Sequence, residues 1–299
     1  MSPKMHAEEI ETDATLVRRL LVAQFPQWAG LPIERVPSAG TDNAMYRLGA
    51  ELVARLPRIG WAVDNVAHEQ TWLPRLAPWL PVAIPAPVGL GVPGDGYPYP
   101  WSVYRWIEGD NPEVGKIEDP EALTHDLAAF IMALQRIDPV GAPAAGRGRP
   151  LATRDAPMRA AIAASEGLVD TAAVTTLWEA ALRAPGWQGA HVWLHGDLAP
   201  GNLLLSGGRL NAVLDFSGVG VGDPAADLPV AWNLLPREAW PLFRELLGVD
   251  DATWARGRGW ALSIAMIQLP YYQHTNPPLA ASARHVIAQV FEDQRAGPA

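Results

Sequence analysis

Three oxygen-bearing side chains in the second half of the chain have the chemistry of a divalent-metal site. Asp197 and Asn202 lie in the run HGDLAPGN, and Asp215 lies in the run VLDF. Carboxylate and amide oxygens are hard ligands that suit magnesium, which usually takes water and phosphate oxygens in its remaining positions. The three residue types therefore indicate a magnesium site that handles phosphate.

A predicted β-hairpin positions two of these side chains. Leu203–Leu205 and Ala212–Leu214 are short apolar runs on either side of a Ser-Gly-Gly turn. Asn202 directly precedes the first run and Asp215 directly follows the second, so antiparallel pairing would bring these ends together. Taken singly, Asp197 and Asn202 could equally cap turns. Their combination at these spacings favours a site.

The motifs HGDLAPGN, VLDF and GDPAADL resemble the signature of the aminoglycoside phosphotransferase family, which is related to choline- and fructosamine-kinase-like enzymes. That family shares the protein-kinase-like fold, in which an Asn follows the catalytic Asp by five positions and a metal-binding Asp comes later. Asn202 stands five positions after Asp197, and Asp215 stands eighteen after it. The resemblance implies that Asp197 orients or deprotonates the acceptor hydroxyl, and that Asn202 and Asp215 bind Mg²⁺.

Three other polar residues of this segment are interpreted as architectural. The resemblance makes His195 a hydrogen-bonding support of the catalytic loop. Asp223 precedes Pro224, a pairing typical of a helix N-cap followed by proline at the first helical position. Asp227 is expected to tie that helix to the catalytic loop.

The first third of the chain is expected to bind the nucleotide. In the resemblance, SAGTDNAMYRL takes the place of the phosphate-covering loop, where Gly40 and Thr41 would offer backbone amides to phosphate. The same segment could equally be an ordinary hairpin turn. The strand LVARLP carries Arg55 where the kinase pattern has a lysine. Arginine binds phosphate through two donors but is not equivalent to lysine in reach or geometry.

Glu69 corresponds to the helix carboxylate of the kinase pattern. It lies three positions after Val66 and four before Leu73, which places it on an apolar face of a predicted helix over Ala62–Leu76. A buried carboxylate needs a partner, and Arg55 is the expected one. The alternative is that Glu69 lies at the edge of this face and is solvated.

The run WSVYRWIEGD resembles the segment that joins the two lobes of a kinase. The resemblance implies that backbone groups of Tyr104, Trp106 and Ile107 bind the edge of the adenine base.

The pattern along the chain predicts an α+β fold of the bilobal protein-kinase-like type. A small β-rich nucleotide-binding lobe is expected over residues 1–107, and a large helical catalytic and substrate-binding lobe over 108–299. Further helices are expected near 119–137, 157–168, 172–184, 224–235, 238–247, 251–268 and 278–295.

Composition supports a folded, acidic, soluble protein. The 299 residues are 49% hydrophobic and 18% charged, with a net charge of −9 and no cysteine. Absent cysteines exclude disulfides and thiolate chemistry, and the acidic balance argues against nucleic acid as a partner. Neither a signal peptide nor a membrane span is evident in the sequence. We expect a cytoplasmic monomer or homodimer.

The expected activity is transfer of the γ-phosphate of ATP or GTP, with Mg²⁺, to a hydroxyl of a small molecule. Eight positions separate Asp215 from Asp223, too few for a peptide-binding activation segment. The acceptor could be an aminoglycoside, a macrolide or a similar antibiotic or metabolite. Aromatic residues of the C-terminal helices slightly favour a bulky, partly apolar alcohol over a polyammonium compound, although such tryptophans are more often core. The alternative is a catalytically weak nucleotide-binding regulatory module on the same fold.

Overall fold

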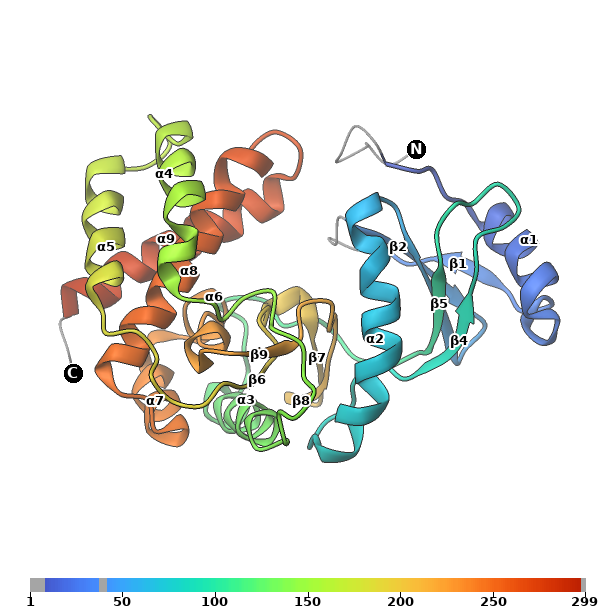
Figure 1. Ribbon diagram of the computed structural model, residues 1–299, viewed down its shortest axis with the longest axis horizontal. Coiled ribbons are helices and arrows are strands. Elements are labelled where there is room, and N and C mark those ends of the chain that lie inside the picture. The colour runs from blue at the N-terminus through green and yellow to red at the C-terminus, as the bar shows by residue number, and fades with distance from the viewer. Residues whose placement is uncertain (1–8, 38–41, 297–299) are drawn as a thin grey trace. The chain divides into compact units, whose positions relative to one another are not determined.

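The computed structural model describes residues 9–37 and 42–296, and its contacts divide into two compact units (Figure 1). The first unit holds the described residues up to Pro78 together with Ala83–Gly109 and Ala212–Ser217. The second holds Trp79–Val82, Asp110–Asn211 and the described residues from Gly218 onward. Each unit is considered by itself below.

A five-stranded antiparallel sheet forms the centre of the first unit, with strand order β1-β2-β3-β5-β4. Strand β2 pairs with β3 from Asn43↔Pro57 to Leu48↔Leu52, across a turn at residues 49–51. Gly49 in the turn has a φ of 59°, a left-handed conformation that glycine adopts without steric cost. The strands are β1 (Ile33–Arg35), β2 (Asn43–Leu48), β3 (Leu52–Pro57), β4 (Pro87–Gly91) and β5 (Trp101–Arg105).

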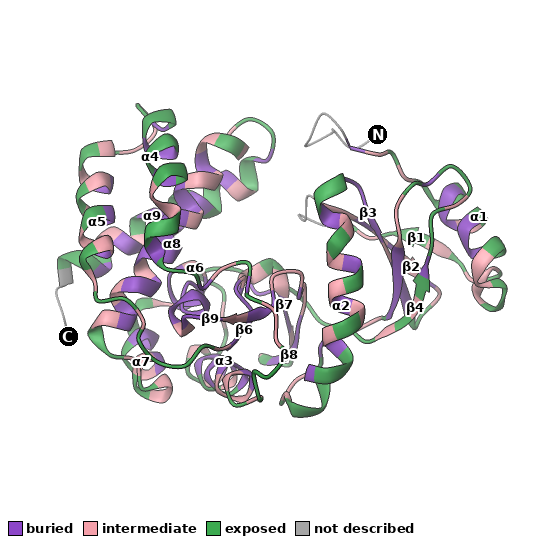
Figure 2. Cartoon of the chain, in the orientation of Figure 1, coloured by how far each residue is buried: buried purple, intermediate pink, exposed green. Residues whose placement is uncertain are grey.

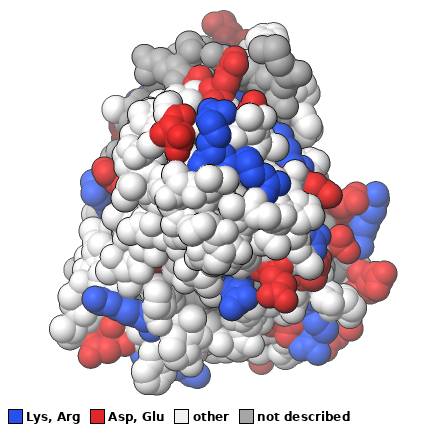
Figure 3. All heavy atoms as spheres, turned by 90° about the vertical axis from the view of Figure 1, so that its right-hand side faces the viewer, with Lys and Arg blue, Asp and Glu red and all other residues white. Residues whose placement is uncertain are grey.

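Two helices cover this sheet. The first, α1 (Ala14–Gln24), begins at the N-cap Asp13 and buries Leu16, Val17, Leu20 and Leu21 in a core shared with the strands. The second, α2 (Val63–Leu76), contacts β4 and β5 and continues through Pro74. Figure 2 shows the buried residues gathered along the strands and along one face of α1. On the face seen in Figure 3, basic and acidic residues are interspersed among neutral ones.

The second unit is predominantly helical. Its helices are α3 (Pro120–Gln135), α4 (Asp155–Ala164), α5 (Thr171–Arg183), α6 (Val230–Asn233), α7 (Trp240–Leu247), α8 (Asp251–Tyr272) and α9 (Pro277–Ala296). Short strands β6 (Val192–Leu194) and β9 (Gly220–Gly222) pair with each other, and β7 (Leu203–Ser206) pairs with β8 (Arg209–Val213). The predicted hairpin is therefore confirmed, whereas β9 was not expected.

Three of the helix predictions are wrong in extent. The helix expected near 157–168 is α4, which ends four residues earlier at Ala164. The expected helix over 224–235 is a 3₁₀ turn, Pro224–Asp227, followed by the single turn of α6. The helix expected to end near residue 268 continues to Tyr272 through Pro270. A proline near the end of a helix loses only one backbone hydrogen bond, so the buried contacts of α8 carry it past this residue.

Tryptophan rings form much of the core of the second unit. The ring of Trp232 lies 4.4 Å from that of Trp254 and 6.0 Å from that of Trp240, measured between centroids. These three residues and Trp260 are at most 5% exposed. Within the described ranges, no helix is long and apolar enough to cross a membrane.

Close packing of α8 against the 3₁₀ turn depends on Gly257. A Cβ atom at this position would lie 2.7 Å from Cβ of Leu228 and 3.3 Å from the carbonyl oxygen of Ala225. Replacing a helical glycine by alanine normally stabilises a helix by about 1 kcal/mol. Here we expect Gly257→Ala to lower the free energy of unfolding by about 1 to 3 kcal/mol, because the added methyl overpacks the contact. Urea denaturation measures this change in the free energy of unfolding.

Gly30→Ala is the matched control. A Cβ at Gly30 would meet nothing within 4 Å, so its urea midpoint should stay within error of the wild type. A Gly257→Ala protein as stable as the wild type would contradict the close approach of α8 to this turn.

Candidate active site

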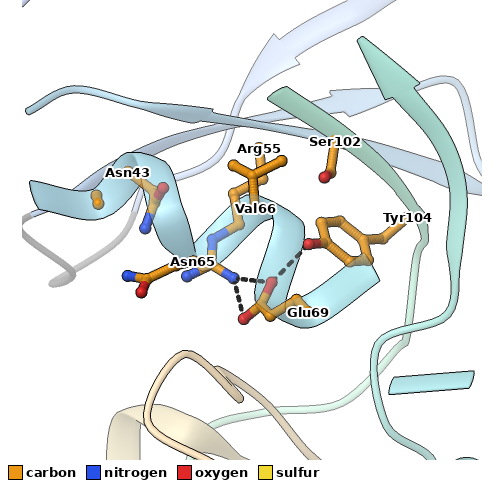
Figure 4. A pocket seen from close by; sticks show the side chains of 8 residues that line it. Asn43, Arg55, Asn65, Val66, Glu69, Ser102 and Tyr104 are labelled. Atoms are coloured by element: carbon orange, nitrogen blue, oxygen red, sulfur yellow. Dashed lines mark hydrogen bonds and ion pairs between the residues drawn. The ribbon is translucent and has the colours of Figure 1, made fainter. Parts of the chain in front are cut away.

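Arg55 lies on β3 and is surrounded by oxygen acceptors. Its Nη1 atom is 2.5 Å from each carboxylate oxygen of Glu69, which comes from α2 (Figure 4). Its Nη2 atom is 3.1 Å from Oδ1 of Asp215. With its amide oxygen turned toward the guanidinium, Asn43 accepts from Nη2 at 3.0 Å and from Nε at 3.2 Å. One arginine therefore joins three elements of the first unit.

The surroundings of this ion pair are largely buried. The side chain of Glu69 is 1% exposed and that of Arg55 is 12% exposed. The phenol of Tyr104 on β5 donates a hydrogen bond to Oε2 of Glu69 at 2.5 Å. The pocket around these groups is lined by Asn43, Arg55, Ala62, Asn65, Val66, Glu69, Ser102 and Tyr104. The predicted inward position of Glu69 and its pairing with Arg55 are confirmed.

Electrostatics keep this cluster in one charge state. Burial alone lowers the pKa of Arg55, but the carboxylates of Glu69 and Asp215 outweigh it and hold the pKa well above the usual value. Burial, and then the charge of Glu69, raises the pKa of Tyr104. Arg55 therefore stays cationic and the phenol of Tyr104 stays protonated as a donor.

Asp215 has an unusual backbone conformation. Its φ of 59° lies in the left-handed region, which is uncommon for residues other than glycine. The amide of Ser217 donates to Oδ1 of Asp215 at 3.3 Å, and the side chain is 39% exposed. Strained backbone that persists in a folded protein clusters at functional sites, so this observation supports a functional role for Asp215.

In the second unit, a buried carboxylate holds the loop that carries Asp197 through hydrogen bonds. Asp227 accepts from the backbone amide of His195 at 2.9 Å and from that of Gly196 at 2.6 Å. Burial raises the pKa of Asp227, although His195 and the two amides oppose the shift. Buried His195 accepts at Nδ1 from the amide of Asp197 at 3.2 Å. The supporting roles predicted for Asp227 and His195 are confirmed.

Asn202 faces Asp197 through its amide nitrogen. Nδ2 donates to the carbonyl oxygen of Asp197 at 2.9 Å and lies 3.4 Å from its Oδ2. Because the nitrogen is engaged in this way, the amide oxygen of Asn202 is the atom available to a cation. Among the described residues, no three His, Asp or Glu side chains cluster as a metal site. Asn202 in the second unit and Asp215 in the first each offer a hard oxygen, the donor type that suits Mg²⁺.

Two predicted phosphate-loop residues, Gly40 and Thr41, lie outside the described residues. The predicted adenine-binding residues Tyr104, Trp106 and Ile107 all lie within the described residues. Tyr104 turns its side chain inward to Glu69, and the backbone N–H of Trp106 donates to the carbonyl of Glu51 at 2.8 Å. Ile107 is half-buried. The adenine-binding roles of these residues remain predictions.

The sequence analysis missed three polar contacts, one within the first unit and two within the second. Arg147 ion-pairs with Asp197, Asn43 contacts Arg55, and Arg256 forms a buried pair with Asp223, with Nε 2.7 Å from Oδ2. Asp223 also caps the 3₁₀ turn through the amide of Ala225, as expected. The two pairs of the second unit join residues 50 and 33 positions apart, so no local pattern could have indicated them. Asn43 and Arg55 lie on the paired strands β2 and β3, and the register of that hairpin could have indicated their contact.

The aromatic residues proposed as walls of an acceptor pocket need a correction. Trp232, Trp240, Trp254 and Trp260 belong to the core, so they give no support to an apolar acceptor. Four of the nearby acids are also engaged, since Asp250 caps α8 and three others pair with arginines. These pairs are Asp251 with Arg244, Glu292 with Arg237 and Asp293 with Arg258.

Comparison with known proteins extends the resemblance read from the motifs. The model of the phosphotransferase enzyme family matches residues 34–260. No curated protein sequence matches the chain significantly.

Solved structures with similar folds cover nearly the whole chain. The GDP and kanamycin complex of APH(2")-IIia has a TM-score of 0.73 and 20% identity, and the match covers 94% of this chain and 99% of that one. The streptomycin–ATP complex of APH(2")-IIa has a TM-score of 0.62 and 18% identity, with coverage of 87% and 90%. Macrolide 2'-phosphotransferase MphH from Brachybacterium faecium has a TM-score of 0.61 and 22% identity, with coverage of 92% and 98%. These likenesses confirm the predicted fold.

Replacing Glu69 tests the buried cluster. Glu69→Gln keeps the shape of the side chain but removes the charge that compensates Arg55. Breaking a buried ion pair on one side costs about 3 kcal/mol or more, because the other charge stays buried. We expect a loss of about 3 kcal/mol in the free energy of unfolding, measured by urea denaturation at neutral pH.

The matched control is Glu51→Gln. The Glu51 side chain is 80% exposed and pairs with the 58% exposed side chain of Arg105, so its loss should leave stability nearly unchanged. Equal stability of the two variants would contradict the contribution to the free energy of unfolding that is assigned to the Arg55–Glu69 pair.

Proposed function

The chain belongs to the phosphotransferase enzyme family, and from this membership we propose that it transfers the terminal phosphate of ATP or GTP to a hydroxyl of a small molecule. The observation that carries the proposal is the Arg55 cluster. A cation fixed between Glu69 and Asp215 stands at the position that the kinase pattern reserves for its phosphate-pairing residue.

The nucleotide is proposed to bind with its phosphates near Arg55 and Asp215. Asn202 and Asp215 would hold Mg²⁺, which would supply positive charge to compensate the phosphates during transfer. Arg55 is held at both ends of its guanidinium, so it needs no reorganisation when the phosphate arrives. Glu69 accepts hydrogen bonds from both Arg55 and Tyr104, and these contacts keep Arg55 in place.

Asp197 is proposed to act on the acceptor. Its carboxylate would accept a hydrogen bond from the hydroxyl and aim the oxygen at the terminal phosphorus. Transfer through a loose transition state requires little covalent chemistry, so orientation and charge compensation supply most of the rate. The amides that donate to Asp227 fix the loop that presents Asp197.

The acceptor is proposed to be a small hydroxylated compound of the kind that the similar structures bind. Those structures are named for complexes with kanamycin and streptomycin and for a macrolide phosphotransferase. Asp223 follows Asp215 by only eight positions, and β9 occupies part of that stretch. The complete set of Asp197, Asn202 and Asp215 argues against a regulatory module without catalysis.

Acceptor-dependent release of ADP or GDP tests the proposal. Purified protein with Mg²⁺ and ATP or GTP is offered a panel of aminoglycosides, macrolides and neutral or acidic sugars, and phosphorylated products are identified by mass. We expect turnover with at least one hydroxylated class. Asp197→Asn should lower kcat by about 10²- to 10⁴-fold, the usual contribution of such a group, while nucleotide affinity is retained.

Glu121→Gln is the control, because Glu121 is an exposed residue of α3, and this variant should turn over at the wild-type rate. Nucleotide binding without any acceptor-dependent release across the panel would contradict the proposed function. Full activity of Asp197→Asn would instead contradict the role of Asp197.

A further inference from the structure

Arg147 makes the closest side-chain contact to the proposed catalytic carboxylate. Its Nη1 atom ion-pairs with Oδ1 of Asp197 and donates to the carbonyl oxygen of Gly196 at 2.6 Å. The side chain of Arg147 is 27% exposed and that of Asp197 is 45% exposed. One guanidinium thus bonds both the carboxylate and the backbone of the loop that carries it.

The segment around Arg147 is fixed on both sides by backbone hydrogen bonds. The amide of Ala145 donates to Val221 at 3.1 Å, and that of Gly146 donates to Gly218 at 3.1 Å. After Arg147, the carbonyl of Gly148 accepts from Asp223 at 2.8 Å. The segment therefore runs beside β9 like an added edge strand, and this fixes the position of the Arg147 backbone.

Glycine is required at the position that follows the arginine. Gly148 has a φ of 93°, and a Cβ there would lie 2.8 Å from Cδ2 of Leu194 and 3.3 Å from the amide of Asp223. The left-handed turn lets the chain leave β9 directly after Arg147. The backbone conformation, and not a flexible loop, sets where the guanidinium lies.

Both oxygens of the Asp197 carboxylate have a nitrogen neighbour. Oδ1 faces Arg147, and Oδ2 lies 3.4 Å from Nδ2 of Asn202. Because both groups are partly exposed, water screens the pair and limits its contribution to stability. Its principal effect is geometric, since a carboxylate held at two points keeps one rotamer.

We propose that Arg147 is a positioning residue, which orients the ionised carboxylate of Asp197 toward the acceptor hydroxyl. This role rests on the proposed function, because it requires Asp197 to act on the acceptor. It differs from a clamp that only holds the loop through the carbonyl of Gly196. A clamp would affect folding whether or not residue 197 is an aspartate, whereas positioning acts only through that carboxylate.

Kinetics of Arg147→Gln test the assignment with an acceptor that the wild-type enzyme phosphorylates. We expect kcat to fall about 10- to 100-fold, in line with the sensitivity of transfer to misplaced groups, while KM for the nucleotide stays within about twofold. Arg147→Lys keeps the charge but loses the reach and the planar geometry of the guanidinium, and it should recover part of kcat. Arg149→Gln, an exposed arginine two positions later, should match the wild type.

A double-mutant cycle separates positioning from a structural clamp. In the Asp197→Asn background, Arg147→Gln should change the single-turnover rate by less than about twofold. The same fold loss in both backgrounds would overturn the proposal, as would a wild-type kcat in Arg147→Gln. Thermal unfolding of each variant is measured in parallel, so a loss of folded protein is scored separately.

Chemical rescue gives a second readout. Millimolar guanidinium chloride should raise kcat of Arg147→Ala at least severalfold relative to equal sodium chloride, because the ion can occupy the vacated place beside Asp197. The positioning role would be contradicted if guanidinium failed to rescue Arg147→Ala and if Arg147→Gln lowered the rate by the same factor in both backgrounds of the double-mutant cycle. An inactive wild-type enzyme would instead contradict the proposed function itself, and this role with it.

Discussion

The buried guanidinium of Arg55 is the constraint around which the first unit is organised. Desolvating a charge costs several kcal/mol, and only well-aligned partners repay that cost. Glu69 supplies both carboxylate oxygens to one nitrogen, and Asp215 supplies an oxygen to the other. The pair fixes the phase of α2 against β3, because a rotation of the helix would leave Arg55 uncompensated. In the proposed function the same fixed cation receives a nucleotide phosphate, so stability and binding would depend on one contact.

In the second unit, backbone N–H groups rather than a side-chain cation compensate a buried carboxylate. Asp227 is fully buried, and the amides of His195 and Gly196 satisfy its carboxylate. This anchor sets the loop, and Arg147 sets the direction of Asp197 within it. Phosphoryl transfer depends mainly on position and charge, so rigid support of a few groups is the function that such a fold has to provide. The Asp197 side chain is 45% exposed, so in the proposed reaction it could meet a substrate without losing its orientation.

Local patterns in the sequence were sufficient for most of the helices and strands, and they named the candidate site residues. Motif spacing identified Asp197, Asn202 and Asp215 as candidates, and helix phase identified Glu69 as buried. Contacts between distant segments could not be read in this way, as the 50 positions from Arg147 to Asp197 illustrate. Tryptophans of the C-terminal helices were ambiguous, because core and pocket faces share one periodicity, and the structure places them in the core. Sequence order also gives a single division into lobes, whereas the contacts group Ala212–Ser217 with the first unit.

The central claim is that Asn202 and Asp215 together hold a divalent ion on the nucleotide phosphates. A crystal structure with Mn²⁺ and a non-hydrolysable nucleotide tests it most directly, because anomalous scattering locates the ion independently of the surrounding protein density. We expect an anomalous peak at about 2.0 to 2.3 Å from the amide oxygen of Asn202, from a carboxylate oxygen of Asp215 and from phosphate oxygens, close to the distances of octahedral magnesium. An ion bound to the phosphates with neither side chain in its coordination sphere would contradict the claim.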